Sequence, residues 1–93
     1  MDKILTESEI ASRLSSVPGW TLVNNELVRT YTVATYLDGL SLVDKVVREA
    51  ERMDHHPSIV LDYKKVTVKY STHSAGGITD LDFKAAQILN KLS

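Results

Sequence analysis

The segment Val66–Ser71 alternates apolar and polar side chains without a break. Its apolar residues are Val66, Val68 and Tyr70, and the residues between them are polar. Successive side chains of a β-strand point to opposite sides of the sheet, so this pattern predicts a strand with one apolar face and one polar face. The rest of the chain therefore has to supply an apolar layer that covers one side of a sheet.

Three further segments are rich in strand-forming residues. The four predicted strands form two consecutive pairs, with turn residues between the two strands of each pair. The first pair, Trp20–Val23 and Leu27–Val33, flanks Asn24-Asn25-Glu26. Asparagine tolerates a positive φ, so this arrangement predicts a hairpin. Ile59–Tyr63 precedes the alternating strand, with Lys64-Lys65 between them, and predicts a second hairpin.

Two of the predicted helices begin with recognisable caps. Thr6 and Glu9 have the spacing of a capping box, which predicts a helix over residues 6–16 that Pro18-Gly19 ends. Thr79, followed by acidic residues in the next turn, predicts the start of a last helix. The apolar stripe of that helix consists of Leu81, Ala85, Ile88, Leu89 and Leu92.

A longer helix is predicted between the two hairpins, with Thr35 or Asp38 as its cap and its end near Met53. Charged residues fall largely on one side of it. The apolar stripe at helical spacing consists of Leu40, Val43, Val47 and Ala50, widened by Val46 and Met53. Pro57 cannot continue the helix, and it disfavours the α conformation at His56.

The order of elements is therefore α-β-β-α-β-β-α. Two hairpins and three amphipathic helices predict an α+β fold, a four-stranded antiparallel sheet with three helices packed on one face. A chain of 93 residues is expected to form a single domain over residues 1–93.

Composition limits what this domain does. The net charge of −1 offers no excess of Lys and Arg for phosphate contacts, so direct nucleic acid binding is not expected. No segment resembles a signal peptide or approaches the roughly 20 apolar residues that span a bilayer, so no membrane association is expected. The absence of cysteine excludes disulfides, thiolate zinc sites and a cysteine nucleophile. It also fits a reducing compartment, so we expect a cytoplasmic protein.

The three histidines lie at two junctions between predicted elements. His55 and His56 lie where the long helix gives way to a strand, and His73 follows the alternating strand. Histidine exchanges protons near neutral pH, and such junctions hold side chains on rigid elements while leaving them accessible. Two carboxylates are within plausible reach, Glu51 one turn before His55 and Asp82 in the first turn of the last helix.

The spacing of the histidines leaves three interpretations open. They are candidate acid and base groups, but adjacent histidines also occur simply as the favourable polar end of a helix. Three imidazoles and a carboxylate could also bind zinc. Adjacent residues rarely converge on one ion and no H-E-x-x-H motif is present, so we expect no metal site. Gly76-Gly77 lacks the flanking residues of a phosphate-binding loop.

Two motifs contain the histidines and both carboxylates. The first is Glu51-x-x-x-His55-His56-Pro57, followed by Tyr63-x-Lys65-Val66. The second is Ser71-Thr72-His73-x-Ala75-Gly76-Gly77-Ile78-Thr79-x-x-Asp82. Together with Gly19-Trp20 and the order of elements, these motifs resemble the pterin-4a-carbinolamine dehydratases over nearly the whole chain. One departure is Ile59, where some members of that family carry an aromatic residue.

This resemblance implies a reaction. The family's substrate is a tetrahydropterin with a hydroxyl on ring carbon 4a, which loses water to give quinonoid dihydropterin in tetrahydrobiopterin recycling. An acid has to protonate the leaving hydroxide and a base has to remove the proton of the neighbouring ring nitrogen, and each positioned transfer contributes about 10²–10⁴-fold. The resemblance therefore implies a hydro-lyase that needs no cofactor.

The resemblance also implies roles for individual residues. It places His55, His56 and His73 at the site, with His55 and His73 as the expected proton-transfer residues. Glu51 and Asp82 are expected to orient the imidazoles or stabilise their charge. Further pterin contacts are expected from Pro57, Thr72, Ser74 and Ala75, and Trp20 is expected either as an apolar wall beside the ring or as part of the core.

Two kinds of macromolecular partner are expected, a second copy of the chain or a transcription factor. A small core and possible free strand edges at Ile59–Tyr63 or Lys65–Ser71 favour a homodimer or homotetramer, with Leu40 and Leu42 as candidates for a second contact. Some animal members of the family also act as dimerisation cofactors of a homeodomain transcription factor. A non-catalytic binding module is therefore the alternative function.

Overall fold

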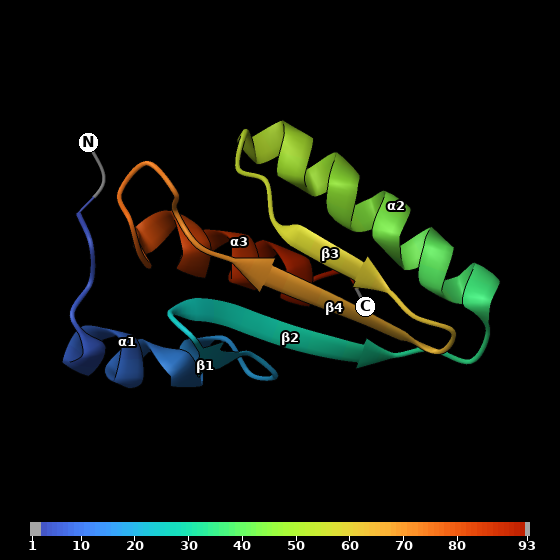
Figure 1. Cartoon of the computed structure of the whole chain (residues 1–93), viewed down its shortest axis with the longest axis horizontal. Helices are drawn as coiled ribbons and strands as arrows, with labels where there is room; N and C mark the ends of the chain where they lie inside the picture. Colours follow the sequence, from blue (N-terminus) through green and yellow to red (C-terminus); the bar gives the residue numbers. More distant parts are fainter. Residues whose placement is uncertain (1–2, 93) are drawn as a thin grey trace.

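The computed structural model describes residues 3–92 and has the predicted order of elements (Figure 1). The helices are α1 (Glu7–Arg13), which continues into a 3₁₀ turn η1 (Leu14–Ser16), α2 (Tyr36–Met53) and α3 (Asp80–Asn90). The strands are β1 (Thr21–Val23), β2 (Glu26–Thr32), β3 (Ser58–Leu61) and β4 (Lys65–Tyr70). The predicted α+β fold, with a four-stranded antiparallel sheet and helices on one face, is confirmed.

The strands lie in the order β1-β2-β4-β3, so β1 and β3 form the two edges. β4 pairs with β2 along one side, where Leu27 is opposite Tyr70, and with β3 along the other, where Ile59 is opposite Val68. The expectation that Lys65–Ser71 could be a free sheet edge is therefore wrong. β4 is a central strand, and the side chains on one of its faces are fully buried.

The alternation that predicted β4 is confirmed by burial. Val66, Val68 and Tyr70 are completely buried beneath the helices, and the residues between them lie on the open face. Trp20 belongs to the same core, and its indole Nε1 donates to Oδ1 of Asn90 at 2.8 Å. The remaining members of the core are Leu5, Ile10, Val17, Leu27, Val46, Ile78, Phe83, Ala85, Ala86 and Leu89.

The predicted hairpin turn between β1 and β2 is confirmed, although it is shorter than expected. Asn24 and Asn25 both have positive φ, 49° and 62°, as the tight two-residue hairpin turn requires. Glu26 already pairs with Val23 and is the first residue of β2.

The caps also follow the sequence. Thr6 and Glu9 form the predicted capping box, and Thr35 rather than Asp38 caps α2. Thr79 caps α3, and the side chain of Asp82 accepts from the Thr79 amide to complete a second capping box. The capping box therefore holds Asp82 at the start of α3 independently of any contact with a histidine.

The apolar stripe predicted for α2 is only partly correct, since Leu40 and Val47 are 53% and 45% exposed. The helix instead packs on a face that contains Gly39, where an added Cβ would lie 2.8 Å from Cδ1 of Leu61. Glycine allows this close approach. Leu42 is partly buried and packs against the core. No helix within residues 3–92 has the length and apolar character needed to cross a membrane.

Candidate active site

The chain leaves α2 through Asp54, which has a left-handed backbone (φ 51°, ψ 42°). The amide of Asp54 bonds to the carbonyls of Ala50 and Glu51, and the amide of His55 returns to Ala50 at 3.0 Å. A left-handed residue in this position satisfies the free carbonyls at a helix end. The turn fixes His55 and His56 as the first residues of the connection to β3.

His55 is the most enclosed of the three histidines, with 12% of its side chain exposed. Its Nε2 lies 2.7 Å from Oδ1 of Asp82, whose side chain is fully buried. An ionised carboxylate only accepts hydrogen bonds, so this contact assigns the proton to Nε2 of His55. In a neutral ring Nδ1 is then the nitrogen that can accept a proton.

The second carboxylate oxygen of Asp82 is held just as firmly. Oδ2 accepts from Oγ1 of Thr72 at 2.8 Å and from the amide of Thr79 at 2.9 Å. The hydroxyls of Thr72 and Thr79 are also 2.8 Å apart. A buried carboxylate is costly unless it is hydrogen-bonded, and these contacts provide the bonds that keep Asp82 in place.

Tyr70 contacts His55 through both its ring and its hydroxyl. The two rings stack with centroids 4.9 Å apart and planes at 29°, and the Tyr70 hydroxyl donates to the His55 carbonyl at 2.9 Å. Burial, and secondarily the negative charge of Asp82, raises the pKa of Tyr70 well above its usual range. The phenol therefore stays protonated and keeps its role as a donor.

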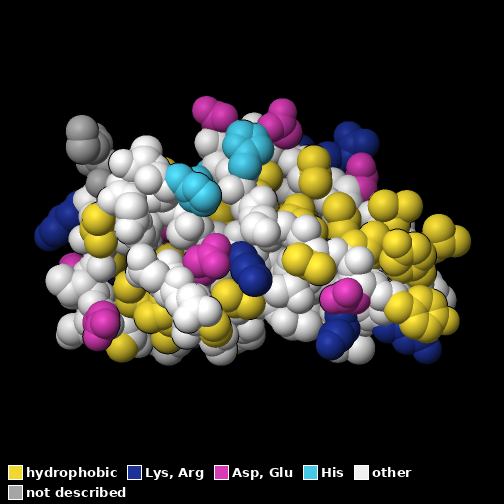
Figure 2. Space-filling model, viewed as in Figure 1, with side chains coloured by type: hydrophobic (Ala, Val, Ile, Leu, Met, Phe, Trp, Pro, Cys, Tyr) yellow, Lys and Arg dark blue, Asp and Glu magenta, His cyan; other side chains and the backbone are white. Residues whose placement is uncertain are grey.

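The other two histidines are more accessible. Nε2 of His56 lies 2.5 Å from Oε2 of Glu51, and both side chains are largely exposed. His73 is exposed in the loop that follows β4. Figure 2 shows histidine side chains at the surface on one face of the molecule. Solvent can therefore reach both of these imidazoles.

All three histidines line one open hollow of about 440 Å³. The other residues around it are Asp54, Ser71, Thr72, Ser74 and Leu81. The fold thus brings together the two histidine motifs, with Asp82 directly behind His55. The loop that carries His73 is closed by backbone bonds from Gly77 and Gly76 to Thr72.

Several residues expected at the site lie away from the hollow. Trp20 is part of the core, which is one of the two positions expected for it. Ile59, where the chain departs from some family members, also packs against the core. Glu51 is exposed on α2 and does not line the hollow, and its carboxylate contacts Nε2 of His56. Pro57 and Ala75 are partly buried and are not among the residues that line the hollow.

Sequence reasoning missed the site positions of Asp54, Ser71, Leu81 and Tyr70. The alternation with Val68 predicts Tyr70 as a core residue. It gives no sign that the His55 ring stacks on the Tyr70 ring. Leu81 likewise belonged to the apolar stripe of α3. Asp54 had a usable signal, since it directly precedes two histidines at a helix end.

The imidazoles do not converge on one point. His55 turns its Nε2 toward Asp82, and His56 turns its own toward Glu51. In the part of the chain that the structure describes, no group of three or more His, Cys, Asp or Glu side chains is arranged to hold a metal ion.

Comparison with known proteins identifies the family of the chain. The family model described as pterin 4 alpha carbinolamine dehydratase matches residues 3–92. The chain belongs to this family. Membership identifies it as a dehydratase, a hydro-lyase.

Individual relatives of this dehydratase are similar along their whole length. A Picosynechococcus protein whose name assigns it to the same family is 41% identical over 88 residues, which is 95% of this chain and 96% of that protein. A Sulfolobus acidocaldarius protein with the same assignment is 39% identical over 88 residues, which is 95% of this chain and 97% of that protein. A crystal structure of a Brucella melitensis "transcriptional coactivator/pterin dehydratase" has a TM-score of 0.89 and 32% identity, and covers 96% of this chain and 97% of its own.

Proposed function

We propose that this chain removes water from a 4a-hydroxytetrahydropterin, giving quinonoid dihydropterin, by histidine acid–base catalysis in tetrahydrobiopterin recycling. The observation that carries the proposal is the buried pair of His55 and Asp82 at a hollow that His73 also lines. Membership of the dehydratase family supplies the class of substrate. We place the reaction in the cytoplasm, which suits a chain without cysteine.

His55 is the proposed base. Its Nε2 proton is committed to Asp82, so Nδ1 is the atom that accepts the proton from ring nitrogen N5 of the substrate. The imidazolium formed in that step lies against the Asp82 carboxylate, which stabilises its positive charge. Asp82 is thus a positioning residue for His55.

His73 is the proposed acid. Its exposed ring can take up a proton from solvent and deliver it to the hydroxyl on carbon 4a. The bond between carbon 4a and oxygen then breaks, a double bond forms between carbon 4a and N5, and water leaves. His56, held by Glu51, contacts the bound pterin, and Ser74 and the backbone at Thr72 add polar contacts.

The direct test is turnover of a synthetic 4a-carbinolamine by the purified protein without added cofactor. We expect acceleration over the spontaneous reaction, unchanged after extensive treatment with a chelator. Absence of any acceleration would exclude the dehydratase proposal. Stoichiometric metal in the purified protein, with activity lost on its removal, would replace acid–base catalysis by a metal mechanism.

A second candidate function is a binding module that assists a transcription factor, as the name of the Brucella melitensis structure suggests for that protein. An apolar surface on α2 favours it, because Leu37 and Leu40 are 73% and 53% exposed. Figure 2 shows hydrophobic side chains gathered at the end of the molecule where α2 begins. A chain that serves only this function would show no turnover in the assay above.

A further inference from the structure

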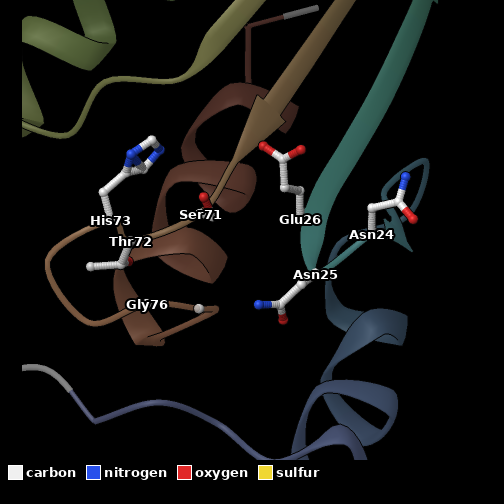
Figure 3. Close-up of a pocket in the computed structure, with 8 residues that line it drawn as sticks. Asn24, Asn25, Glu26, Ser71, Thr72, His73 and Gly76 are labelled. Atoms are coloured by element: carbon white, nitrogen blue, oxygen red, sulfur yellow. The ribbon is translucent and has the colours of Figure 1, made fainter.

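A second hollow, of about 290 Å³, adjoins the candidate active site. The two hollows share Ser71, Thr72 and His73. The opposite wall of the second hollow is formed by the turn residues Asn24 and Asn25 and by Glu26, the first residue of β2. Gly76 lies at its lower edge in Figure 3, and Gly77 lines it as well. We call this hollow the Glu26 pocket.

Local backbone geometry builds the Glu26 pocket. β2 pairs with β4 so that Leu27 is opposite Tyr70, and this register brings Glu26 beside Ser71. Figure 3 shows Glu26 across from Ser71 and the amide of Asn25 directed toward the Gly76 loop. A Cβ added at Gly77 would lie 3.3 Å from Cγ2 of Ile4 and 3.5 Å from Nδ2 of Asn25, so the Asn25 amide lies close beside Gly77.

The pocket has a defined chemical character. Glu26 is the one carboxylate among the described residues that line it, and no lysine or arginine joins it there. Within residues 3–92, the Glu26 side chain has no ion pair and no hydrogen bond, although it is partly buried. An ionised carboxylate accepts hydrogen bonds from hydroxyl or ammonium groups and repels anions. Asn25 adds both a donor and an acceptor.

We propose that the Glu26 pocket binds the substituent on carbon 6 of the pterin and selects a neutral hydroxylated substituent over an anionic one. This inference rests on the proposed function. Only N5 separates carbon 4a from carbon 6, so a pterin that reacts beside His73 carries its substituent next to the wall that both hollows share. The carbonyl on the other side of carbon 4a is an acceptor, which makes it a poor neighbour for Glu26.

The test compares three carbinolamines that differ at carbon 6, bearing a dihydroxypropyl, a methyl or a carboxylate group. Glu26→Gln keeps the shape of the side chain and removes its charge. We expect it to raise KM for the dihydroxypropyl substrate about tenfold, as loss of a charged hydrogen bond does, with kcat unchanged. KM for the methyl substrate should stay the same, and KM for the carboxylate substrate should fall. Glu7→Gln, an exposed change in α1, is the matched control.

Equal effects of Glu26→Gln on all three substrates would overturn the inference, and so would no effect on any. Failure of the wild-type protein to turn over any carbinolamine would instead reject the proposed function. In that case, calorimetric titration with the unreactive dihydropterins that carry the same three groups still tests whether the Glu26 pocket binds the substituent on carbon 6. Wild-type preference for the dihydroxypropyl compound, lost in Glu26→Gln, would support it, and equal affinities would reject it.

Discussion

Nε2 of His55 lies 2.7 Å from Oδ1 of Asp82, although the two residues are 27 positions apart. Asp82 is also the residue that closes the capping box at the start of α3, through the amide of Thr79. The same carboxylate thus joins the end of α2, the start of α3 and, through Thr72, the end of β4. Changes to this carboxylate should therefore affect both the stability of the fold and the chemistry of the site.

Asp82→Asn tests this double role. The amide cannot accept at both of its ends, so one of the partners of the carboxylate loses its bond and His55 loses its charge partner. We expect kcat to fall about 10²-fold or more, and the free energy of unfolding to fall by about 1–3 kcal/mol. Kinetics and urea denaturation measure the two effects. Asp80→Asn, which removes only an exposed ion pair with Arg13, should leave both nearly unchanged.

The three histidines should separate by kinetic effect. If His55 and His73 each transfer a proton in the transition state, changing either to Ala should lower kcat by about 10²-fold or more. His56→Ala should mainly raise KM, because its exposed pair with Glu51 positions it for contact with the pterin.

The double variant His55→Ala with His73→Ala provides a further check. It should cost less than the product of the two single effects, since residues that act as a unit are not additive. Circular dichroism has to accompany the kinetics, because a histidine at a helix end also affects stability. Folded single variants with wild-type kcat would show that neither residue is catalytic.

The order of elements, the caps and the central alternating strand could all be predicted, because each depends on neighbours in sequence. Thr6, Thr35 and Thr79 act within three residues of themselves. The orientation of α2 could not be predicted in this way. Leu40 has the apolarity of a core residue but is exposed, whereas the packed face of α2 contains Gly39, where an added Cβ would lie 2.8 Å from Cδ1 of Leu61.

The candidate site was likewise predictable only in part. The motifs named the histidines and Asp82 as candidates, but the pairing of His55 with Asp82, and of His56 with Glu51, depends on where the chain turns at Asp54. A left-handed aspartate has no strong sequence signal. The Glu26 pocket was not foreseen, because it joins two hairpins whose register only the folded sheet defines.

Self-association is expected as a homodimer or homotetramer. β3 is an edge strand of the sheet, and Leu37 and Leu40 are exposed on α2. Sedimentation equilibrium at tens of micromolar should detect the oligomer, and Leu40→Glu should reduce its size by placing a charge in an apolar contact. Gln87→Glu, an exposed change on α3, is the matched control. A wild-type monomer at this concentration would contradict the prediction.

Removal of two buried tyrosine hydroxyls should have different effects on the free energy of unfolding. The Tyr70 hydroxyl donates to the His55 carbonyl, so Tyr70→Phe should lower the free energy of unfolding by about 1 kcal/mol. The Tyr31 hydroxyl is buried without a partner among residues 3–92, so Tyr31→Phe should be neutral or stabilising. Urea denaturation of both variants at neutral pH measures the contrast. Equal losses in the two would show that the Tyr31 hydroxyl is satisfied in solution.

Tyr70 also predicts how stability depends on alkaline pH. Burial, and then the charge of Asp82, raises the pKa of Tyr70 above the value of roughly 10 that tyrosine has in an unfolded chain. Above that pH the unfolded state loses this proton while the folded state keeps it, so the free energy of unfolding falls as pH rises. Tyr70→Phe removes this contribution. Its stability difference from wild type should therefore be constant between about pH 8 and 9 and shrink above about pH 10. A difference that stays constant to higher pH would show that the fold does not hold the Tyr70 proton.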